Sequence, residues 1–118
     1  MILTRAAPRR IAGIMDTLSR LEATIAARRD ADPEVSWVAK LHQRGIPVIA
    51  RKLGEEAVET IVAALTGSRE ELIGEAADTL FHLLVLLDAK GVPLADVLAE
   101  LDRRDGTSGI AEKAGRSE

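Results

Sequence analysis

Two groups of carboxylates are the residues best suited to chemistry in this 118-residue chain. Glu55, Glu56 and Glu59 fall within one short segment, and Glu75 and Asp78 fall within another. Residues three or four positions apart share one face of an α-helix, so each group would present its side chains together. Ionised carboxylates held close together raise one another's pKa unless a cation neutralises them. The spacing therefore predicts a cation site.

The ligand chemistry indicates which cation this would be. Oxygen ligands without Cys or His favour a hard cation, Mg²⁺, with Mn²⁺ as a substitute. The alternative is that each acid pairs with a surface Lys or Arg. The sequence offers few partners for such ion pairs, because Arg69 is the only Lys or Arg between Gly54 and Lys90.

Basic residues precede the first carboxylate group. Arg51 and Lys52 lie one turn before it, and Lys40 and Arg44 lie on the short segment upstream. A surface salt bridge is the simplest role for any one of them. Together with a metal they resemble a polyphosphate site, where Mg²⁺ bridges phosphate oxygens and Lys or Arg neutralises the remaining charge.

Apolar periodicity predicts the helices that must position these groups. The predicted helices cover residues 11–29, 32–45, 47–67, 68–91 and 93–105; Asp32 with Pro33 opens the second, and a capping box of Ser68 and Glu71 opens the fourth. No alternating pattern of strand length occurs, so we predict an all-α fold, an antiparallel bundle of about five helices. The short turn at Gly67 makes the third and fourth helices a hairpin, which brings Glu59 and Glu75 to the same height.

The same patterns predict the domain organisation and the oligomeric state. We expect a flexible N-terminal tail over residues 1–10, a single domain over 11–105 and a mobile C-terminal tail over 106–118. The segment 79–87 is apolar nearly all the way round and must be covered on both sides. We therefore expect a homodimer.

Composition excludes several classes of protein. The absence of Cys excludes disulfide frameworks and thiolate metal sites and is compatible with a cytoplasmic location. Trp37 and Phe81 are the only aromatic residues, which argues against a nucleic-acid stacking surface. The longest apolar run, 83–87, is too short to cross a membrane. His82 is more simply a hydrogen-bonded core residue than a ligand, and His42 receives no role.

The pattern Glu-Glu-x-x-Glu followed by Glu-x-x-Asp resembles that of the all-α nucleoside triphosphate pyrophosphatase superfamily, which includes MazG-like enzymes. Within the superfamily the chain is similar to the HisE-type phosphoribosyl-ATP pyrophosphatases. That closer similarity covers 18–116 and rests on the segments 36–41, 52–56, 78–82 and 104–113.

The resemblance implies an activity and a site. The activity is Mg²⁺-dependent hydrolysis of the α–β phosphoanhydride of phosphoribosyl-ATP to phosphoribosyl-AMP and pyrophosphate, the second step of histidine biosynthesis, by a homodimer. The implied metal ligands are Glu56, Glu59, Glu75 and Asp78. Glu55 and Glu56 would be catalytic, with Glu55 acting as a further ligand or as the group that orients the attacking water. The residues that would contact the substrate are Lys40, Lys52 and Trp37. Trp37 stands where the family usually has Tyr. We further predict that Lys113 and Arg116 in the tail order over the bound substrate.

Two rival functions share parts of this pattern. A house-cleaning pyrophosphatase acting on other nucleoside triphosphates would have the same carboxylates, and would differ in the segment 36–41 and in the tail. A non-catalytic helical dimer would have the same helices, with its acids merely solvated. Substrate preference separates the first rival, and the response to Mg²⁺ separates the second.

Overall fold

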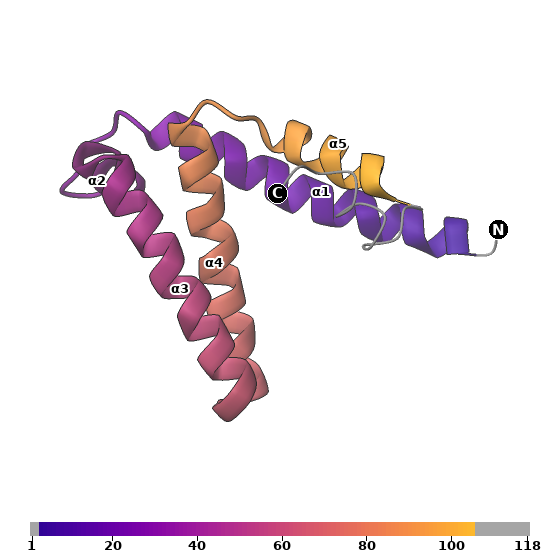
Figure 1. Ribbon diagram of the computed structural model, residues 1–118. Helices are drawn as coiled ribbons and strands as arrows, with labels where there is room; N and C mark the ends of the chain where they lie inside the picture. The colour runs from indigo at the N-terminus through magenta and orange to yellow at the C-terminus, as the bar shows by residue number, and fades with distance from the viewer. Residues whose placement is uncertain (1–2, 106–118) are drawn as a thin grey trace, which may run out of the picture.

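The computed structural model describes residues 3–105, which form five α-helices and, over that range, no strand (Figure 1). This confirms the predicted all-α fold. The helices are α1 (Leu3–Arg28), α2 (Trp37–Arg44), α3 (Ile46–Thr66), α4 (Arg69–Ala89) and α5 (Leu94–Arg104). The predicted tail over 106–118, with Lys113 and Arg116, lies outside the described residues.

Two predicted helix starts are corrected by the structure. Helix α1 begins at Leu3 rather than at residue 11, in a segment rich in Ala and Arg, which are strong helix formers. Helix α2 begins at Trp37 rather than near Asp32, because the Ser36 hydroxyl accepts a hydrogen bond from the Ala39 amide at 3.2 Å and caps the helix there. The Asp32 carboxylate instead accepts from the Glu34 amide and closes a preceding turn.

Helices α3 and α4 form the predicted antiparallel hairpin, and Figure 1 shows them side by side over their length. Helix α3 ends at Gly67, whose amide donates to the Ala63 carbonyl, and the capping box of Ser68 and Glu71 begins α4. The hydroxyl oxygens of Thr60 and Thr79 lie 2.8 Å apart, in hydrogen-bond contact across the hairpin. This contact and the short turn together are compatible with only one register of the two helices.

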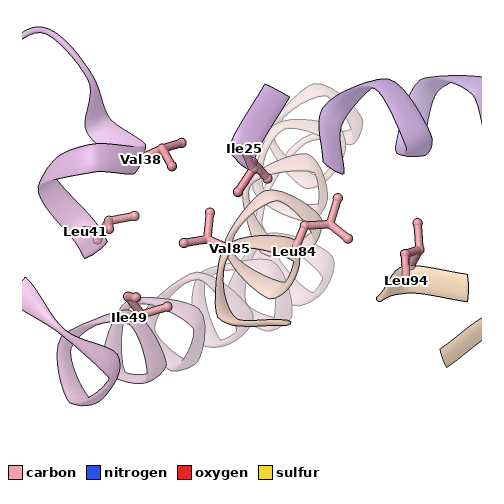
Figure 2. Packing of buried hydrophobic residues seen from close by; sticks show 7 residues of the cluster. All are labelled: Ile25, Val38, Leu41, Ile49, Leu84, Val85 and Leu94. Carbon is pink, nitrogen blue, oxygen red and sulfur yellow. The ribbon is translucent and has the colours of Figure 1, made fainter. Parts of the chain in front are cut away.

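A small apolar core joins all five helices at one end of the hairpin (Figure 2). It consists of Ile25, Val38, Leu41, Ile49, Leu84, Val85 and Leu94. Leu84 and Val85 are buried by neighbours from the same chain, and Leu86 and Leu87 pack against the same core. Within the segment 79–87 only His82, Leu84 and Val85 are buried in the single subunit, and Leu80 is 49% exposed. The expectation that a second subunit completes the cover of this segment stays a prediction.

A polar cluster closes the base of the hairpin beside this core. The Arg29 guanidinium donates two hydrogen bonds to the Asp88 carboxylate, at 2.6 and 3.1 Å. The His42 Nε2 atom lies 3.0 Å from the same carboxylate, and its Nδ1 atom lies 3.0 Å from the Val38 carbonyl oxygen. Asp88 therefore anchors α2, α4 and the end of α1 together, a role that the sequence analysis did not assign to it or to His42.

Replacing Asp88 by Asn is expected to destabilise the fold. Asp88→Asn keeps the shape of the side chain and removes the charge that Arg29 and His42 share, at a cost of about 1 to 3 kcal/mol in the free energy of unfolding. Urea unfolding measures this loss. The exposed Asp102 on α5 provides the control, since Asp102→Asn removes the same charge far from the cluster. Equal stability of the two variants would contradict the anchoring role.

Candidate metal centre

Three carboxylates converge where α3 and α4 face each other. Glu56 on α3 and Glu75 and Asp78 on α4 each offer one oxygen, and these oxygens all lie within 4.8 Å of one another. Oxygen ligands of one hard divalent cation are separated by up to about 4 Å, so small side-chain rotations would let the three share one ion. Of the five predicted carboxylates, these three are the ones that the structure brings together in this way.

The pKa values of two carboxyls in this cluster are raised by burial and by neighbouring negative charges. Glu56 is only 8% exposed, and its burial raises the pKa of its carboxyl. A side-chain hydrogen bond with Glu59 and the charge of Glu59 raise that pKa further, while Lys52 acts in the opposite direction. Burial and the charges of Glu59 and Asp78 also raise the pKa of Glu75. A group of acids with raised pKa values takes up either a proton or a cation.

The other two predicted acids lie at the edge of the cluster. Glu59 is exposed and its charge acts on the pKa of Glu56, so it is adjacent to the three convergent carboxylates without belonging to that set. Glu55 points elsewhere: its carboxylate lies 3.6 Å from the Arg51 guanidinium and 3.4 Å from the Lys52 ammonium, and its side chain is 48% exposed. Surface ion pairs of this kind contribute little to stability.

Basic and aromatic side chains of α2 and α3 are further predicted site residues. The Lys52 ammonium lies 5.9 Å from the centroid of the Trp37 ring, within range of a cation–π contact. Trp37 in turn donates from Nε1 to His82 Nε2 at 3.3 Å. Lys40 is partly buried on α2, and within the described part of the chain it is not one of the groups that perturb Glu56.

His82 is a buried, hydrogen-bonded residue, as the sequence analysis favoured, and lies outside the three-carboxylate set. An indole N–H can only donate, so the Nε2 atom that receives it must be the unprotonated nitrogen. The Nδ1 atom then carries the proton and donates it to the Asp78 carbonyl oxygen at 2.7 Å. Both ring nitrogens are thus committed to neutral-imidazole contacts.

Protonation of Glu56 and Glu75 is expected to stabilise the metal-free fold. Both pKa values are raised above the ordinary 4.5, so the folded chain binds these protons more tightly than the unfolded chain does. That stabilisation is complete below about pH 4.5 and is lost as the pH rises through the raised values. Urea unfolding in the presence of EDTA, at a series of pH values above 4.5, measures the effect.

The matched control for this prediction is Glu56→Gln, which removes one of the two titrating groups. Its free energy of unfolding should fall less steeply with pH than that of the wild type. The carboxyls of Glu71 and Glu100, whose pKa values are lowered, the latter to about 2, titrate below this window and leave the comparison unaffected. Identical pH slopes for the two proteins would contradict the prediction.

Comparison with known proteins assigns the chain to a family. Residues 18–105 match the family model described as phosphoribosyl-ATP pyrophosphohydrolase. The chain belongs to the phosphoribosyl-ATP pyrophosphohydrolase family. The match includes every carboxylate of the cluster, so the family assignment and the candidate metal centre concern the same part of the molecule.

Curated members of the phosphoribosyl-ATP pyrophosphohydrolase family are similar to nearly the whole chain. The phosphoribosyl-ATP pyrophosphatase of Erythrobacter litoralis is 66% identical over 104 residues, which are 88% of this chain and 100% of the relative. That of Rhizorhabdus wittichii is 68% identical over 100 residues, 85% and 94% of the two chains. That of Novosphingobium aromaticivorans is 66% identical over 102 residues, 86% and 95%. The resemblance drawn from the sequence motifs is confirmed.

The described residues contain no helix that is long and apolar enough to cross a membrane. In this member of the phosphoribosyl-ATP pyrophosphohydrolase family, the long helices α3 and α4 instead carry charged residues at their centres, where the carboxylate cluster is built.

Proposed function

We propose that this chain is a phosphoribosyl-ATP diphosphatase, which hydrolyses the α–β phosphoanhydride of phosphoribosyl-ATP and releases phosphoribosyl-AMP and pyrophosphate. It would carry out the second step of histidine biosynthesis. The observation that carries this proposal is the convergence of Glu56, Glu75 and Asp78 in a chain of this family. Relatives that are 66–68% identical and named phosphoribosyl-ATP pyrophosphatase support the same substrate.

The proposed cofactor is Mg²⁺, with Mn²⁺ able to replace it. An all-oxygen donor set with a buried carboxyl of raised pKa is suited to a hard cation, and Glu59, next to Glu56, is the proposed fourth ligand. When bound, the ion would supply positive charge that polarises a phosphate oxygen and stabilises the charge on the leaving group.

Residues at the edge of the cluster have proposed roles in handling the substrate. Lys52 neutralises phosphate oxygens, Lys40 does the same from α2, and the 42% exposed ring of Trp37 lines the substrate site. Glu55 and Glu56 are the proposed catalytic acids. Glu55 is held by ion pairs with Lys52 and Arg51, and a phosphate that takes over those cations would release its carboxylate to orient water.

A substrate panel tests the proposed activity. Turnover of phosphoribosyl-ATP is compared with that of ATP and other nucleoside triphosphates, each with Mg²⁺ and with EDTA. Hydrolysis of phosphoribosyl-ATP that strongly exceeds the others and requires Mg²⁺ is the expected result. Comparable or faster turnover of plain nucleotides would instead favour a MazG-like house-cleaning enzyme. No Mg²⁺-dependent hydrolysis of any of them would favour a non-catalytic helical dimer.

We propose a homodimer that covers an apolar face on α3. Val58, Ile61, Val62 and Leu65 follow the spacing of a single helix face and are 52–78% exposed. Adjacent large apolar side chains left in water on one helix usually mark an interaction surface. A second copy of the same chain is the proposed occupant, because the face lies on the hairpin, on the part of the molecule farthest from the core that α1, α2 and α5 cover (Figure 1).

The other proposed partners are few. Phosphoribosyl-ATP is the small-molecule substrate, and we propose no nucleic-acid or membrane partner. A cytoplasmic location is proposed because the relatives are named as enzymes acting on a nucleotide, and the absence of cysteine is compatible with it.

The tail contributes to substrate binding in this proposal. Lys113 and Arg116 would order over bound substrate and neutralise its phosphates. Truncation after Asp105 is expected to raise KM for phosphoribosyl-ATP about tenfold or more, as the loss of charge-assisted hydrogen bonds implies, with unchanged Mg²⁺ activation. The double substitution Lys113→Ala and Arg116→Ala should reproduce most of that rise. An unchanged KM in both variants would refute the role.

A further inference from the structure

Trp37 combines exposure with firm anchoring. It is 42% exposed, which is unusual for an indole that serves only to fill a core. Its Nε1 atom nevertheless donates to the buried His82, and the two rings meet edge to face with centroids 6.5 Å apart. A side chain that is held at one end and open to solvent at the other is suited to present its ring to something outside the core.

The contacts of Trp37 form a continuous path from one carboxylate residue to a cation. The path begins at the Asp78 carbonyl oxygen, 2.7 Å from His82 Nδ1, and continues 3.3 Å from His82 Nε2 to the Trp37 indole. It ends at the Lys52 ammonium, 5.9 Å from the Trp37 ring centroid. The path joins α4, α2 and α3, and the carboxylate cluster lies between two of these helices, α3 and α4.

The end of this path reaches the carboxylate cluster electrostatically. Lys52 and Glu56 are four residues apart on α3 and so share one helix face, and the Lys52 charge lowers the pKa of Glu56 against the larger effects of burial and Glu59. A cation placed beside a metal-binding cluster is in position to meet the phosphate oxygens that the metal does not contact.

We propose that His82 is a positioning residue for phosphate binding: it fixes the Trp37 indole, and the indole fixes the Lys52 ammonium beside the carboxylates. This inference rests on the proposed function and adds to it a residue that does not touch the substrate. His82 acts through the direction of its two hydrogen bonds, one accepted from Trp37 and one donated to Asp78.

Packing alone would not require histidine here. His82 also meets Phe81 edge to face with centroids 5.0 Å apart, a contact that an apolar side chain could largely replace. Glutamine carries a donor and an acceptor that can meet the same two partners, whereas leucine carries neither. His82→Gln and His82→Leu therefore separate the hydrogen-bonding role from the filling of space.

A spectroscopic test follows from composition, because Trp37 is the only tryptophan and its emission reports on this position without a label. In the full-length protein, His82→Leu is expected to increase acrylamide quenching of Trp37 emission, and His82→Gln is expected to leave it near the wild-type level. His42→Gln is the matched control, since His42 anchors the same helix through Asp88. It should lower thermal stability without changing the quenching.

Kinetics test the consequence for Lys52. His82→Leu is expected to raise KM for phosphoribosyl-ATP about 3- to 10-fold, the range that losing one hydrogen bond and a cation–π contact implies. The expected kcat is nearly unchanged, and His82→Gln should restore KM. Trp37→Phe keeps an aromatic ring near Lys52 and loses the N–H, whereas Trp37→Leu loses both. The KM of Trp37→Phe should therefore be higher than that of the wild type and lower than that of Trp37→Leu.

A binding measurement separates this inference from the proposed function. Inorganic pyrophosphate with Mg²⁺ is titrated while Trp37 emission is followed, and His82→Leu is expected to weaken its affinity by the same factor as it raises KM. If the wild type fails to hydrolyse phosphoribosyl-ATP but pyrophosphate affinity still depends on His82, the proposed function fails and the positioning role stands. If His82→Leu matches the wild type in quenching and in pyrophosphate affinity, the positioning role is overturned.

Discussion

Glu56→Gln and Asp78→Asn are each expected to lower kcat/KM for phosphoribosyl-ATP by at least about 100-fold, the scale seen when a group that stabilises transition-state charge is removed. The two residues come from facing helices and bring their oxygens within the same 4.8 Å cluster as Glu75. Either substitution keeps the side-chain shape and removes one charged ligand. Steady-state kinetics over a range of Mg²⁺ concentrations measures the loss.

The fold should survive these substitutions. Removing a carboxylate relieves repulsion in the metal-free chain, so both variants should unfold at the same temperature as the wild type or higher in EDTA, and should gain less stability from added Mg²⁺. Glu70→Gln is the control, because Glu70 is an exposed acid on the same helix as Asp78. Nearly normal turnover by Glu56→Gln or Asp78→Asn, with wild-type stabilisation by Mg²⁺, would eliminate the metal-centre hypothesis.

Ile61→Glu and Leu65→Glu are each expected to convert the proposed dimer to a monomer. In a symmetric dimer each substitution would place two charges in one apolar interface, and an unpaired buried charge costs several kcal/mol. Light scattering coupled to size exclusion should show the mass fall from twice 12.6 kDa to 12.6 kDa. Val35→Glu, which adds the same charge at an exposed position before α2, should leave the dimer intact. A monomeric wild type, or variants that stay dimeric, would contradict the proposed interface.

The hairpin and its carboxylates could be predicted because their determinants are local. The capping box of Ser68 and Glu71 and the stop at Gly67 define where one helix ends and the next begins. Antiparallel neighbours joined by a short turn leave little freedom in register, so residue counting predicted that the two carboxylate groups converge, with Glu59 level with Glu75. In the structure Glu56 is the residue of α3 whose oxygen meets those of Glu75 and Asp78, and Glu59 lies beside them.

The contacts that hold the site in place could not be predicted in this way. Trp37 and His82 are 45 positions apart, and His42 and Asp88 are 46 apart. Such pairs depend on how α2 packs against α4, which no local spacing encodes. Glu55 is a different case, because its ion pairs with Arg51 and Lys52 are local pairs at i,i+4 and i,i+3 spacing on α3. Spacing alone allowed Glu55 either these pairs or a place in the cluster.

Competing local signals explain the error at α2. Asp32 followed by Pro33 and the later Ser36 are both plausible helix starts by residue type. In the structure Ser36 caps α2, and Asp32 closes a separate turn. A helix starting at Asp32 would have been about a full turn longer, and residue type alone does not decide between the two caps.

The hydroxyl contact between Thr60 and Thr79 has a consequence for the spacing of the carboxylate oxygens. The two threonines directly follow Glu59 and Asp78 in sequence, and their oxygens lie 2.8 Å apart. A slip of one helix along the other by a single turn, about 5.4 Å, would exceed the 4.8 Å that now encloses the three carboxylate oxygens. We therefore expect that this contact between two neutral side chains, together with the short turn at Gly67, helps to hold the three carboxylate oxygens at their present spacing.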